Sequence, residues 1–556
     1  MHRSYSYPEY VYRRPVALDR LGPEPCNVVI VGGGPVGLTA ALELAGHGIE
    51  TILLDEDDTV SGGSRSICWS KRTLEVLDRS GVADRMVDKG VLWQRGRVYR
   101  GEREIYDFDL LPEPGHKMPA FINLQQYYAE EYMIDEAAKS DLIEFRWLNR
   151  VSGIEIVDNQ AMLSVTTPDG TYRIRACHVI AADGVRSTIR RSMGLDFDGR
   201  TFEERFLITD IRMDVDFPEE RRFWFDPTFH KGKSALFHRQ PDNVYRIDLQ
   251  LGPETDPKEE ANPDTVVARI RRMIGDDLDF DIEWISVYTF TCRRMARFRH
   301  GPVFFAGDSA HVVSPFGARG GNGGIQDVDN LAWKLALVLK GEARETLLET
   351  YNSERVPAAD ENLMNSSRST DFMTPKNQVS EDFREAVLDL SERVPFARSL
   401  VNSGRLSRPH CYRADILDTC DDTFFLGEGI PTGAAALDAP VSDSGRVGWL
   451  LNYLGGRFVL LWFWPSGAFG ENVCEKLADA LLGFKPSVEL IVLSKISYTG
   501  MLGDPEGLAF RRWSGELGAM YLVRPDQHIA GRWRGTATPE MIGAVLDRAV
   551  AGTGER

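Results

Sequence analysis

Residues 28–38 read VVIVGGGPVGL, and this stretch decides the fold of the chain around it. Its apolar, β-branched beginning predicts a buried strand, and the residues after the glycines have the apolar spacing of a helix. Gly32, Gly34 and Gly37 stand between the two at the spacing G-x-G-x-x-G. Glycines at these positions permit a tight turn, a close approach of phosphate to the backbone and close packing of helix on strand. The stretch therefore predicts a dinucleotide site whose pyrophosphate lies at the helix N-terminus.

An acidic residue follows this unit at the end of the next predicted strand, residues 50–54. Asp55 stands about 20 residues after the glycines, where a carboxylate can accept a hydrogen bond from a ribose hydroxyl. Glu56 is adjacent and could take the same role, so the sequence leaves the two open. Strand, glycines, helix, strand and acid in this order favour a cofactor site over a simple turn. The residues expected to contact the cofactor here are Gly32, Gly34, Pro35, Val36, Gly37, Asp55 and Glu56.

A second glycine-rich stretch, residues 307–324, reads GDSAHVVSPFGARGGNGG. It follows an apolar run that predicts a strand at 302–306, and helical periodicity begins at Asp327. The glycines of 317–324 predict a loop whose backbone approaches something flat or charged. This order suits a carboxylate, Asp308, that bonds a ribityl hydroxyl while helix-end N–H groups face a flavin ring. Together the two glycine-rich stretches predict bound FAD.

A third segment, residues 177–190, reads CHVIAADGVRSTIR and predicts a strand, an Asp-Gly turn at Asp183 and a basic helix. The three segments, in this order, resemble the single-component flavin monooxygenases that hydroxylate aromatic rings, the para-hydroxybenzoate hydroxylase type. The resemblance extends over about residues 25–400. More narrowly, the chain resembles the branch of 3-(3-hydroxyphenyl)propionate and polyketide hydroxylases, whose members carry an extra C-terminal domain.

The resemblance implies an α/β fold with a Rossmann-like FAD-binding domain, an interleaved α+β substrate domain built on an antiparallel sheet, and a thioredoxin-like C-terminal domain. The expected parts are an N-terminal arm at 1–24, the FAD-binding domain at 25–200 and 290–410, the substrate domain at 201–289, and the thioredoxin-like domain at 428–556. The second part of the FAD-binding domain is expected to end in a helical segment. Cys474 stands alone in the C-terminal domain, so we expect a structural or dimer-supporting role there and no dithiol chemistry.

The resemblance also implies the chemistry. NADH or NADPH reduces the FAD, O₂ converts the reduced flavin to a C4a-hydroperoxide, and the terminal oxygen passes to a ring carbon ortho or para to a phenolic hydroxyl. The protein must exclude water and help to ionise the phenol. Further cofactor contacts implied are Arg65, Gln125, Asp183, Asp308, Pro315, Gly320, Gly321 and Asn322. For Arg65 and Gln125, a solvated arginine and a helix-capping glutamine are the alternatives.

Candidate catalytic residues come from the predicted strand 244–250, whose alternation places Arg246, Asp248 and Gln250 on one face. If this face meets the flavin, Arg246 could hold a carboxylate or phenolate, and Asp248 or His238 could assist proton removal. Gln250 would then contact the substrate. If the face meets water, all of them are solvated surface, and the sequence leaves this choice open. The remaining expectations concern the Gly-Asp loop, where Pro315 and Phe316 form a substrate wall and His311 is structural.

Composition excludes several classes of function. A formal charge of −18 argues against nucleic acid and anionic membranes as partners. The longest apolar stretch, residues 458–464, is too short to span a bilayer, and residues 1–21 lack the apolar run of a secretory signal. The seven cysteines are scattered without C-x-x-C or His/Cys clusters, which predicts no metal site and a reducing cytoplasm. We expect a cytoplasmic enzyme with a small phenolic substrate, and a homodimer stays open.

Two alternatives to a phenol hydroxylase remain. Residues 462–464 read WFW, which superficially resembles the tryptophan motif of flavin-dependent halogenases, but they lie far in sequence from the flavin loops. This argues against a halogenase. Other flavin chemistry on an aromatic compound, as in a halogenase or an oxidase, is nevertheless kept as one alternative, and a FAD-binding protein without catalytic activity is the other. NAD(P)H consumption that a substrate stimulates distinguishes an enzyme from a binding protein.

Overall fold

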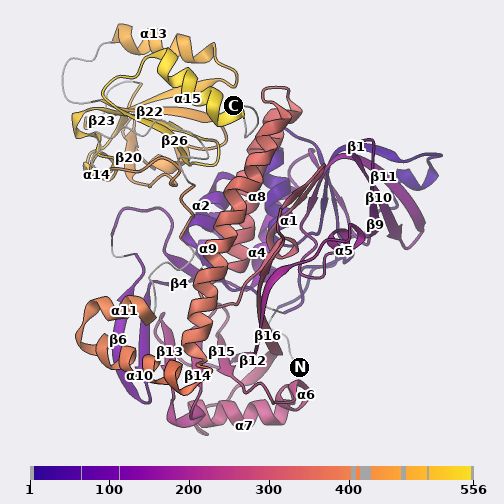
Figure 1. Cartoon of the computed structure of the whole chain (residues 1–556), viewed down its shortest axis with the longest axis vertical. Coiled ribbons are helices and arrows are strands. Elements are labelled where there is room, and N and C mark those ends of the chain that lie inside the picture. Colours follow the sequence, from indigo (N-terminus) through magenta and orange to yellow (C-terminus); the bar gives the residue numbers. More distant parts are fainter. Residues whose placement is uncertain are drawn as a thin grey trace.

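The computed structural model describes residues 5–63, 65–111, 113–401, 408–412, 428–464, 471–496 and 500–551. The first four residues of the expected arm, residues 402–407 of the expected helical segment and residues 552–556 lie outside the described part. Figure 1 shows the C-terminal unit, in orange and yellow, at one end of the molecule and the sheet backed by α7 at the other.

A parallel sheet forms around the first glycine-rich stretch, in the strand order β18-β11-β1-β2-β8. Its strands are β1 (Glu24–Val31), β2 (Thr51–Leu54), β8 (Ile143–Arg146), β11 (Gly170–Ala181) and β18 (Val303–Phe305). The antiparallel strands β9 (Arg150–Val157), β10 (Gln160–Thr167) and β17 (Arg299–His300) extend it. Helix α1 (Pro35–Gly46) follows β1 and packs against α4 (Gln126–Ala137) and α8 (Gly320–Leu339). The predicted strand–glycine–helix–strand unit is confirmed, and α5 (Thr188–Ser192) follows the Asp-Gly turn as predicted.

Helix α8 corrects the expected loop at residues 317–324. The sequence periodicity places the helix start at Asp327, but the helix begins at Gly320, inside the glycine-rich run. The reason is packing: a Cβ on Gly324 would lie 2.6 Å from Val36 Cγ2 and 2.8 Å from Gly307 Cα. The glycines therefore let the first turn of α8 approach α1 and the Gly-Asp turn closely. Helical periodicity is read from apolar side chains, and this first turn of α8 is made mostly of glycines, so the periodicity does not reveal it.

A second, mainly antiparallel sheet has the order β19-β16-β12-β15-β14-β13-β5-β6. Its strands are β5 (Arg95–Arg100), β6 (Arg103–Asp109), β12 (Asp198–Arg212), β13 (Arg221–Phe225), β14 (Ser234–Arg239), β15 (Val244–Gln250), β16 (Asp281–Arg294) and β19 (His311–Val312). The predicted strand 244–250 is confirmed as β15. Strands β5 and β6 of this sheet come from the segment expected to bind FAD, residues 25–200. Their charged sequences conceal the apolar alternation of a strand.

The two faces of this sheet have different neighbours. Tyr245, Ile247 and Leu249 point to one side, where they form a core with Val266 and Ile270 of α7 (Pro263–Ile274). Short helix α6 (Pro257–Glu260) precedes α7. The opposite side contributes Phe206, Leu236 and Phe290 to another core. A separate small sheet consists of β3 (Cys68–Ser70), β7 (Phe121–Asn123) and β4 (Val91–Trp93). Cys68 of β3 interacts electrostatically with Arg246 on this side of the larger sheet.

Helices connect these layers and continue beyond them. After β3 come α2 (Lys71–Arg79) and α3 (Ala83–Lys89). Beyond α8, the expected helical stretch is divided into α9 (Thr350–Met373), α10 (Gln378–Arg393) and α11 (Pro395–Val401). Within the described residues, none of the helices has both the length and the apolar character that crossing a bilayer requires.

The C-terminal unit, defined here as residues 428–551, has its own seven-stranded sheet. Strands β22 (Phe458–Trp464) and β23 (Val488–Ser494) are parallel and joined by α13 (Glu471–Leu482), and β25 (Ala519–Val523) and β26 (Ile529–Arg534) form an antiparallel hairpin before α15 (Pro539–Ala551). This βαβ–ββα order is typical of the thioredoxin-like fold. The remaining elements are β20 (Pro440–Asp443), β21 (Arg446–Trp449), β24 (Leu502–Gly503) and α14 (Leu508–Arg512).

Candidate active site

The turn after β1 has the geometry that a dinucleotide phosphate needs. Gly32 has a φ of 106°, and a Cβ there would lie 2.5 Å from the carbonyl oxygen of Ala182. A Cβ on Gly37 would lie 1.9 Å from the carbonyl oxygen of Gly32. Pro35 and Val36 begin α1, so the unpaired N–H groups of its first turn face the end of β1. The turn fits a pyrophosphate.

Asp55, rather than Glu56, is the acid directed at this turn. Its Oδ2 accepts a hydrogen bond from the Gly33 N–H, and its Oδ1 accepts one from the Asp57 N–H at 2.8 Å. Burial raises the pKa of Asp55 to about 6. Glu56 is exposed. Between the two positions that the sequence left open, only Asp55 lies beside the glycines.

The Gly-Asp loop brings Asp308 together with Arg65. Asp308 is accessible to solvent, yet the protein around it raises its pKa by desolvation, and Arg65 opposes this rise. Asp308 in turn raises the pKa of Tyr288, which burial also raises. A Cβ on Gly320 would lie 3.9 Å from Asp308 Oδ1, so the α8 N-terminus adjoins the same carboxylate. The arrangement fits a flavin held between Asp308, Arg65 and the start of α8.

Gly321 and Asn322 continue this helix start with different environments. A Cβ on Gly321 would lie 3.4 Å from Ser66 Oγ. The Asn322 Oδ1 accepts from the Ser70 N–H and the Thr73 hydroxyl at 2.9 and 2.6 Å, and its Nδ2 donates to the carbonyls of Cys68 and Ala318 at 2.9 and 2.6 Å. The Asn322 side chain has no donor or acceptor left for a cofactor. It joins α8 to β3 and α2 instead.

Gln125 and Asp183 each keep one buried oxygen without a hydrogen-bond partner in the described part of the chain: Gln125 Oε1 and Asp183 Oδ1. Gln125 stands at the N-terminus of α4 without capping it and donates to the carbonyl of Pro241 at 3.3 Å. Asp183 Oδ2 accepts from the Ile189 N–H at 3.1 Å, and burial raises the Asp183 pKa. Buried polar atoms are nearly always paired. Both positions therefore fit a bound polar group such as the FAD.

The face of β15 that carries Arg246 and Asp248 lies mostly inside the protein, with Arg246 buried and Asp248 partly exposed. Strand pairing aligns Asp210, Arg246 and His238 across β12, β15 and β14, and all three are buried. The opposite face of β15 packs on α7. Of the two alternatives for this face, the structure supports the internal one.

Arg246 is engaged within the protein. Its Nε donates to Asp210 Oδ1 at 2.9 Å and its Nη2 to Asp210 Oδ2 at 3.0 Å, which is a two-bond ion pair. Gln240 also donates to Asp210 Oδ1, at 3.0 Å. The Arg246 guanidinium lies 5.3 Å from the centre of the Trp284 ring. The expectation that Arg246 holds a substrate anion is therefore not supported, because Asp210 already neutralises it.

Asp248 and His238 both retain unused polar atoms. Burial raises the pKa of Asp248 to about 6, although Arg246 and Arg221 lower it, and Asp248 Oδ1 has no partner among the described residues. Burial holds the pKa of His238 well below its ordinary value, and the neighbouring arginines lower it further. Its Nδ1 also lacks a described partner. Near neutral pH, Asp248 is a carboxylate that can take up a proton, and His238 is a neutral imidazole.

Arg221, the first residue of β13, is the site residue that sequence reasoning missed. It has no hydrogen bond or ion pair with any residue that the structure describes, and its guanidinium lies 5.8 Å from the centre of the Trp93 ring. Burial lowers its pKa, against the effects of Cys68 and Asp248. In sequence it lies in a charged run beside Arg222, which resembles solvated surface. Strand alternation could have indicated it, because Arg221 lies on the same face of β13 as the aromatic residue Phe223.

The other predicted substrate contacts, Gln250, Pro315 and Phe316, have different environments. Gln250 Oε1 accepts from the Ser234 N–H and hydroxyl, both at 3.0 Å, so this amide oxygen holds β14 to β15. Phe316 is buried, with its ring centre 5.0 Å from that of Phe206 and 5.1 Å from that of Phe290. Pro315 is exposed. Phe316 belongs to an apolar wall, and Pro315 lies at its edge.

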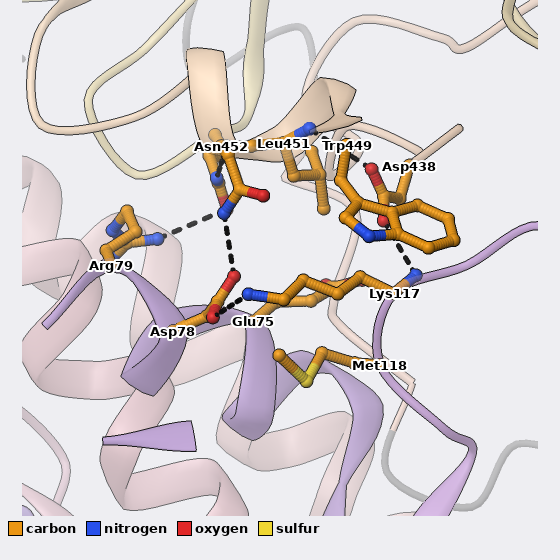
Figure 2. Close-up of a pocket in the computed structure, with 10 residues that line it drawn as sticks. Glu75, Asp78, Arg79, Lys117, Met118, Asp438, Trp449, Leu451 and Asn452 are labelled. Atoms are coloured by element: carbon orange, nitrogen blue, oxygen red, sulfur yellow. Dashed lines mark hydrogen bonds and ion pairs between the residues drawn. The ribbon is translucent and has the colours of Figure 1, made fainter. Parts of the chain in front are cut away.

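A separate pocket lies where α2 meets the C-terminal unit (Figure 2). Lys117 and Asp78 form an ion pair there, and Asn452 donates to Asp78 Oδ2 at 2.8 Å. The Lys117 N–H donates to Asp438 Oδ2 at 2.9 Å. None of the predicted cofactor or catalytic residues lines this pocket. It is a polar seam between parts of the chain, apart from the candidate active site.

The chain is similar to known flavoproteins over most of its length. The model of the FAD binding domain family matches residues 25–366. A flavin-dependent monooxygenase of Mycobacteroides abscessus is 35% identical over 60% of this chain and 72% of its own length. A 3-(3-hydroxy-phenyl)propionate/3-hydroxycinnamic acid hydroxylase of Mycolicibacterium smegmatis is 26% identical over 94% of this chain and 93% of its own.

The fold also matches a solved structure. The crystal structure of the flavin-dependent monooxygenase PieE in complex with FAD and substrate aligns with a TM-score of 0.79 at 23% identity, over 95% of this chain and 99% of that one. The expected three-part fold is thereby confirmed. The protein belongs to the FAD binding domain family of single-component aromatic hydroxylases, and it is a monooxygenase that uses FAD, NAD(P)H and O₂.

Proposed function

We propose that this enzyme hydroxylates a phenolic ring whose anionic oxygen is bound by Arg221. The observation that carries the proposal is a half-buried cation without an ion-pair partner in the described part of the chain, whose charge interacts with Asp248 and His238. A charge that is partly desolvated and unpaired favours a ligand of opposite sign. A phenolate or a substituent carboxylate satisfies it.

The chain's own residues prepare the phenol. Asp248 Oδ1, which has no described partner, accepts the phenolic proton. With a pKa of about 6, Asp248 is ionised at neutral pH and can act as a general base. Arg221 then stabilises the phenolate, which makes the ortho and para carbons more electron-rich. FAD, reduced by NAD(P)H, supplies the activation of O₂ when it is bound.

His238 and the apolar wall orient the ring and exclude water. Because His238 is neutral, it does not compete with the substrate for Arg221, and its Nδ1 can hydrogen-bond a second substituent. Trp93 meets the His238 ring edge to face, with 6.4 Å between ring centres. Phe316 packs with Phe206 and Phe290. A dry site favours oxygen transfer over release of H₂O₂.

The Mycolicibacterium smegmatis relative supports this substrate class, because both substrates in its name are phenols that carry a carboxylic acid. The test is a panel of phenols with and without a carboxylate, assayed with NADH and with NADPH. We expect anionic phenols to accelerate NAD(P)H oxidation and to gain one oxygen atom in the product. Equal rates with neutral aromatic compounds would refute the role of Arg221. Acceleration by no phenol would refute the substrate class.

We further propose that residues 25–200, except β5 and β6, and 290–410 form the FAD-binding domain, that 201–289 with β5 and β6 form the substrate domain, and that 428–556 form a thioredoxin-like domain. In the C-terminal domain, Cys474 lies in α13 as a free thiol, and burial raises its pKa, whereas a reactive thiol has a lowered pKa. This supports a role for the domain without dithiol chemistry. All described cysteines are free, which supports the cytoplasm as the site of action.

A further inference from the structure

The flavin loop, defined here as the glycine-rich stretch 307–324, is fixed by one buried acid, Asp327 on α8. Its Oδ2 accepts from the Gly307 N–H at 3.0 Å and lies 2.6 Å from His311 Nε2, and its Oδ1 accepts from Arg355 Nε at 2.8 Å. Burial alone would raise the pKa of Asp327, but His311 and Arg355 lower it. The carboxylate therefore stays ionised and fixes the turn that presents Asp308.

Arg355, on α9, connects this carboxylate to two further places. Its Nη2 donates to the carbonyl of Gly323 at 3.3 Å, so it bonds the end of the glycine-rich stretch directly and reaches the beginning, Gly307, through Asp327. Its Nη1 donates to the hydroxyl of Tyr412 at 3.3 Å. Tyr412 lies beyond the FAD binding domain match, which ends at residue 366.

Tyr412 contacts the C-terminal unit directly. Its ring centre lies 4.5 Å from that of His528, and the Arg524 guanidinium lies 5.2 Å from the same ring. Its N–H donates to the carbonyl of Gly433 at 2.9 Å. Arg524 and His528 belong to the turn between β25 and β26. Two side chains, Arg355 and Tyr412, are thus all that separate Asp327 from this turn.

The same turn is anchored to α8 and α9 by buried charges. Arg524 donates to both carboxylate oxygens of Glu354 at 2.7 and 2.9 Å, and Lys334 donates to Glu354 Oε2 at 2.7 Å. Arg524 also pairs with Asp526. Glu354 precedes Arg355 on α9, so a displacement of the turn moves Arg355 as well.

We propose that the C-terminal unit positions the flavin loop: its turn at 524–528 sets Tyr412 and Arg355, and these set Asp327 and the Gly307–Asp308 turn. Tyr412 and Arg355 are positioning residues, because neither is among the predicted cofactor contacts. The unit thereby serves FAD binding without any dithiol chemistry of its own.

The test compares Tyr412→Phe with a matched docking variant, Arg512→Ala. Arg512 also ties the C-terminal unit to the rest of the chain, through the carbonyls of Gly115 and Pro114 at 2.7 and 2.6 Å, but it touches no member of the path to Asp327. Both variants are prepared as full-length apoprotein. Hydrogen–deuterium exchange of residues 303–325 and the Kd for FAD, from flavin fluorescence, are then measured.

We expect Tyr412→Phe to speed exchange in residues 303–325 and to weaken FAD binding about three- to tenfold, the size of one lost hydrogen bond. Arg512→Ala should leave both at wild-type values. Wild-type exchange and affinity in Tyr412→Phe would overturn the proposal. Equal effects of the two variants would also overturn it, because the unit would then act through docking in general. The exchange measurement needs no turnover, so its failure is distinct from a wrong substrate class.

A second pair of variants covers the possibility that Tyr412→Phe does not fold. His528→Phe keeps an aromatic ring against Tyr412, and His528→Ala removes it. The expected result is wild-type FAD affinity in the first and weaker affinity in the second. Equal affinity in both would show that the contact of the turn with Tyr412 does not reach the flavin loop.

Discussion

Replacing Arg221 by methionine should lower activity without lowering stability. Methionine keeps an unbranched side chain but removes the cation that has no ion pair in the described structure. A hydrogen bond to a charged group contributes about 1.5–3 kcal/mol. At about 1.4 kcal/mol per factor of ten, kcat/KM for an anionic phenol should fall about 10- to 150-fold.

The free energy of unfolding gives the second half of the prediction. Because burial lowers the pKa of Arg221, the folded protein holds this charge at a cost, and the apolar replacement should leave stability unchanged or raise it. Urea denaturation of the FAD-loaded protein measures this. A loss of stability together with activity would refute the reasoning, since it would mean that Arg221 serves the fold.

The adjacent Arg222 supplies the matched control. Its Nε lies 2.8 Å from Glu220 Oε1, with side chains 26% and 7% exposed, and it points to the other face of β13. Arg222→Met should lower stability by about 1 kcal/mol or less and leave kcat/KM unchanged. Equal losses of kcat/KM in the two variants would show that the charge of the sheet, and not its placement, affects the reaction.

Asp248→Asn should lower kcat with phenols and abolish the loss of activity that the wild type shows as pH falls through about 6; a pH–rate profile in which that limb persists would assign it to another group. The folded-state pKa of Asp248 lies above the unfolded value of about 3.9, so its ionisation penalises folding as pH rises through this window, and Asp248→Asn should have the higher Tm at pH 8. Gly37→Ala should abolish FAD binding, because its Cβ would lie 1.9 Å from the Gly32 carbonyl oxygen; a yellow holoprotein would contradict this. Glu354→Gln should cost about 3–5 kcal/mol of unfolding free energy, because it leaves the buried Arg524 and Lys334 short of a counter-charge; a loss under 1 kcal/mol in urea denaturation would contradict that account.

The cofactor site could be read from the sequence because its constraints are local. A Cβ at Gly32 or Gly37 collides with backbone a few residues away or on the neighbouring strand, so glycine itself is the signal. The same holds for the order of strand, turn and helix around Asp183 and Asp308. Asn322 shows the limit of this reasoning, because its four hydrogen bonds go to β3, α2 and the preceding turn, and no spacing rule reveals them.

The substrate side depends on strand register, which one sequence does not contain. Whether Arg246 or Arg221 is available to a substrate follows from Asp210 lying directly opposite Arg246, across β12 and β15. The same register decides that Gln250 serves Ser234. Likewise, the start of α8 depends on glycines packing against Val36, a contact between segments almost three hundred residues apart. Pairings of this kind emerge only in three dimensions.

The closing strand of the parallel sheet has a consequence for how the enzyme matures. β18 pairs with β11, so the sheet that begins at β1 is complete only after the ribosome has released strands β12 to β16 of the antiparallel sheet, which lie between β11 and β18 in sequence. The turn at 524–528 emerges later still, and it anchors α8 and α9. Contacts so distant in sequence form slowly. Cofactor loading is therefore an event of the finished polypeptide, and a nascent chain has no complete flavin site to fill.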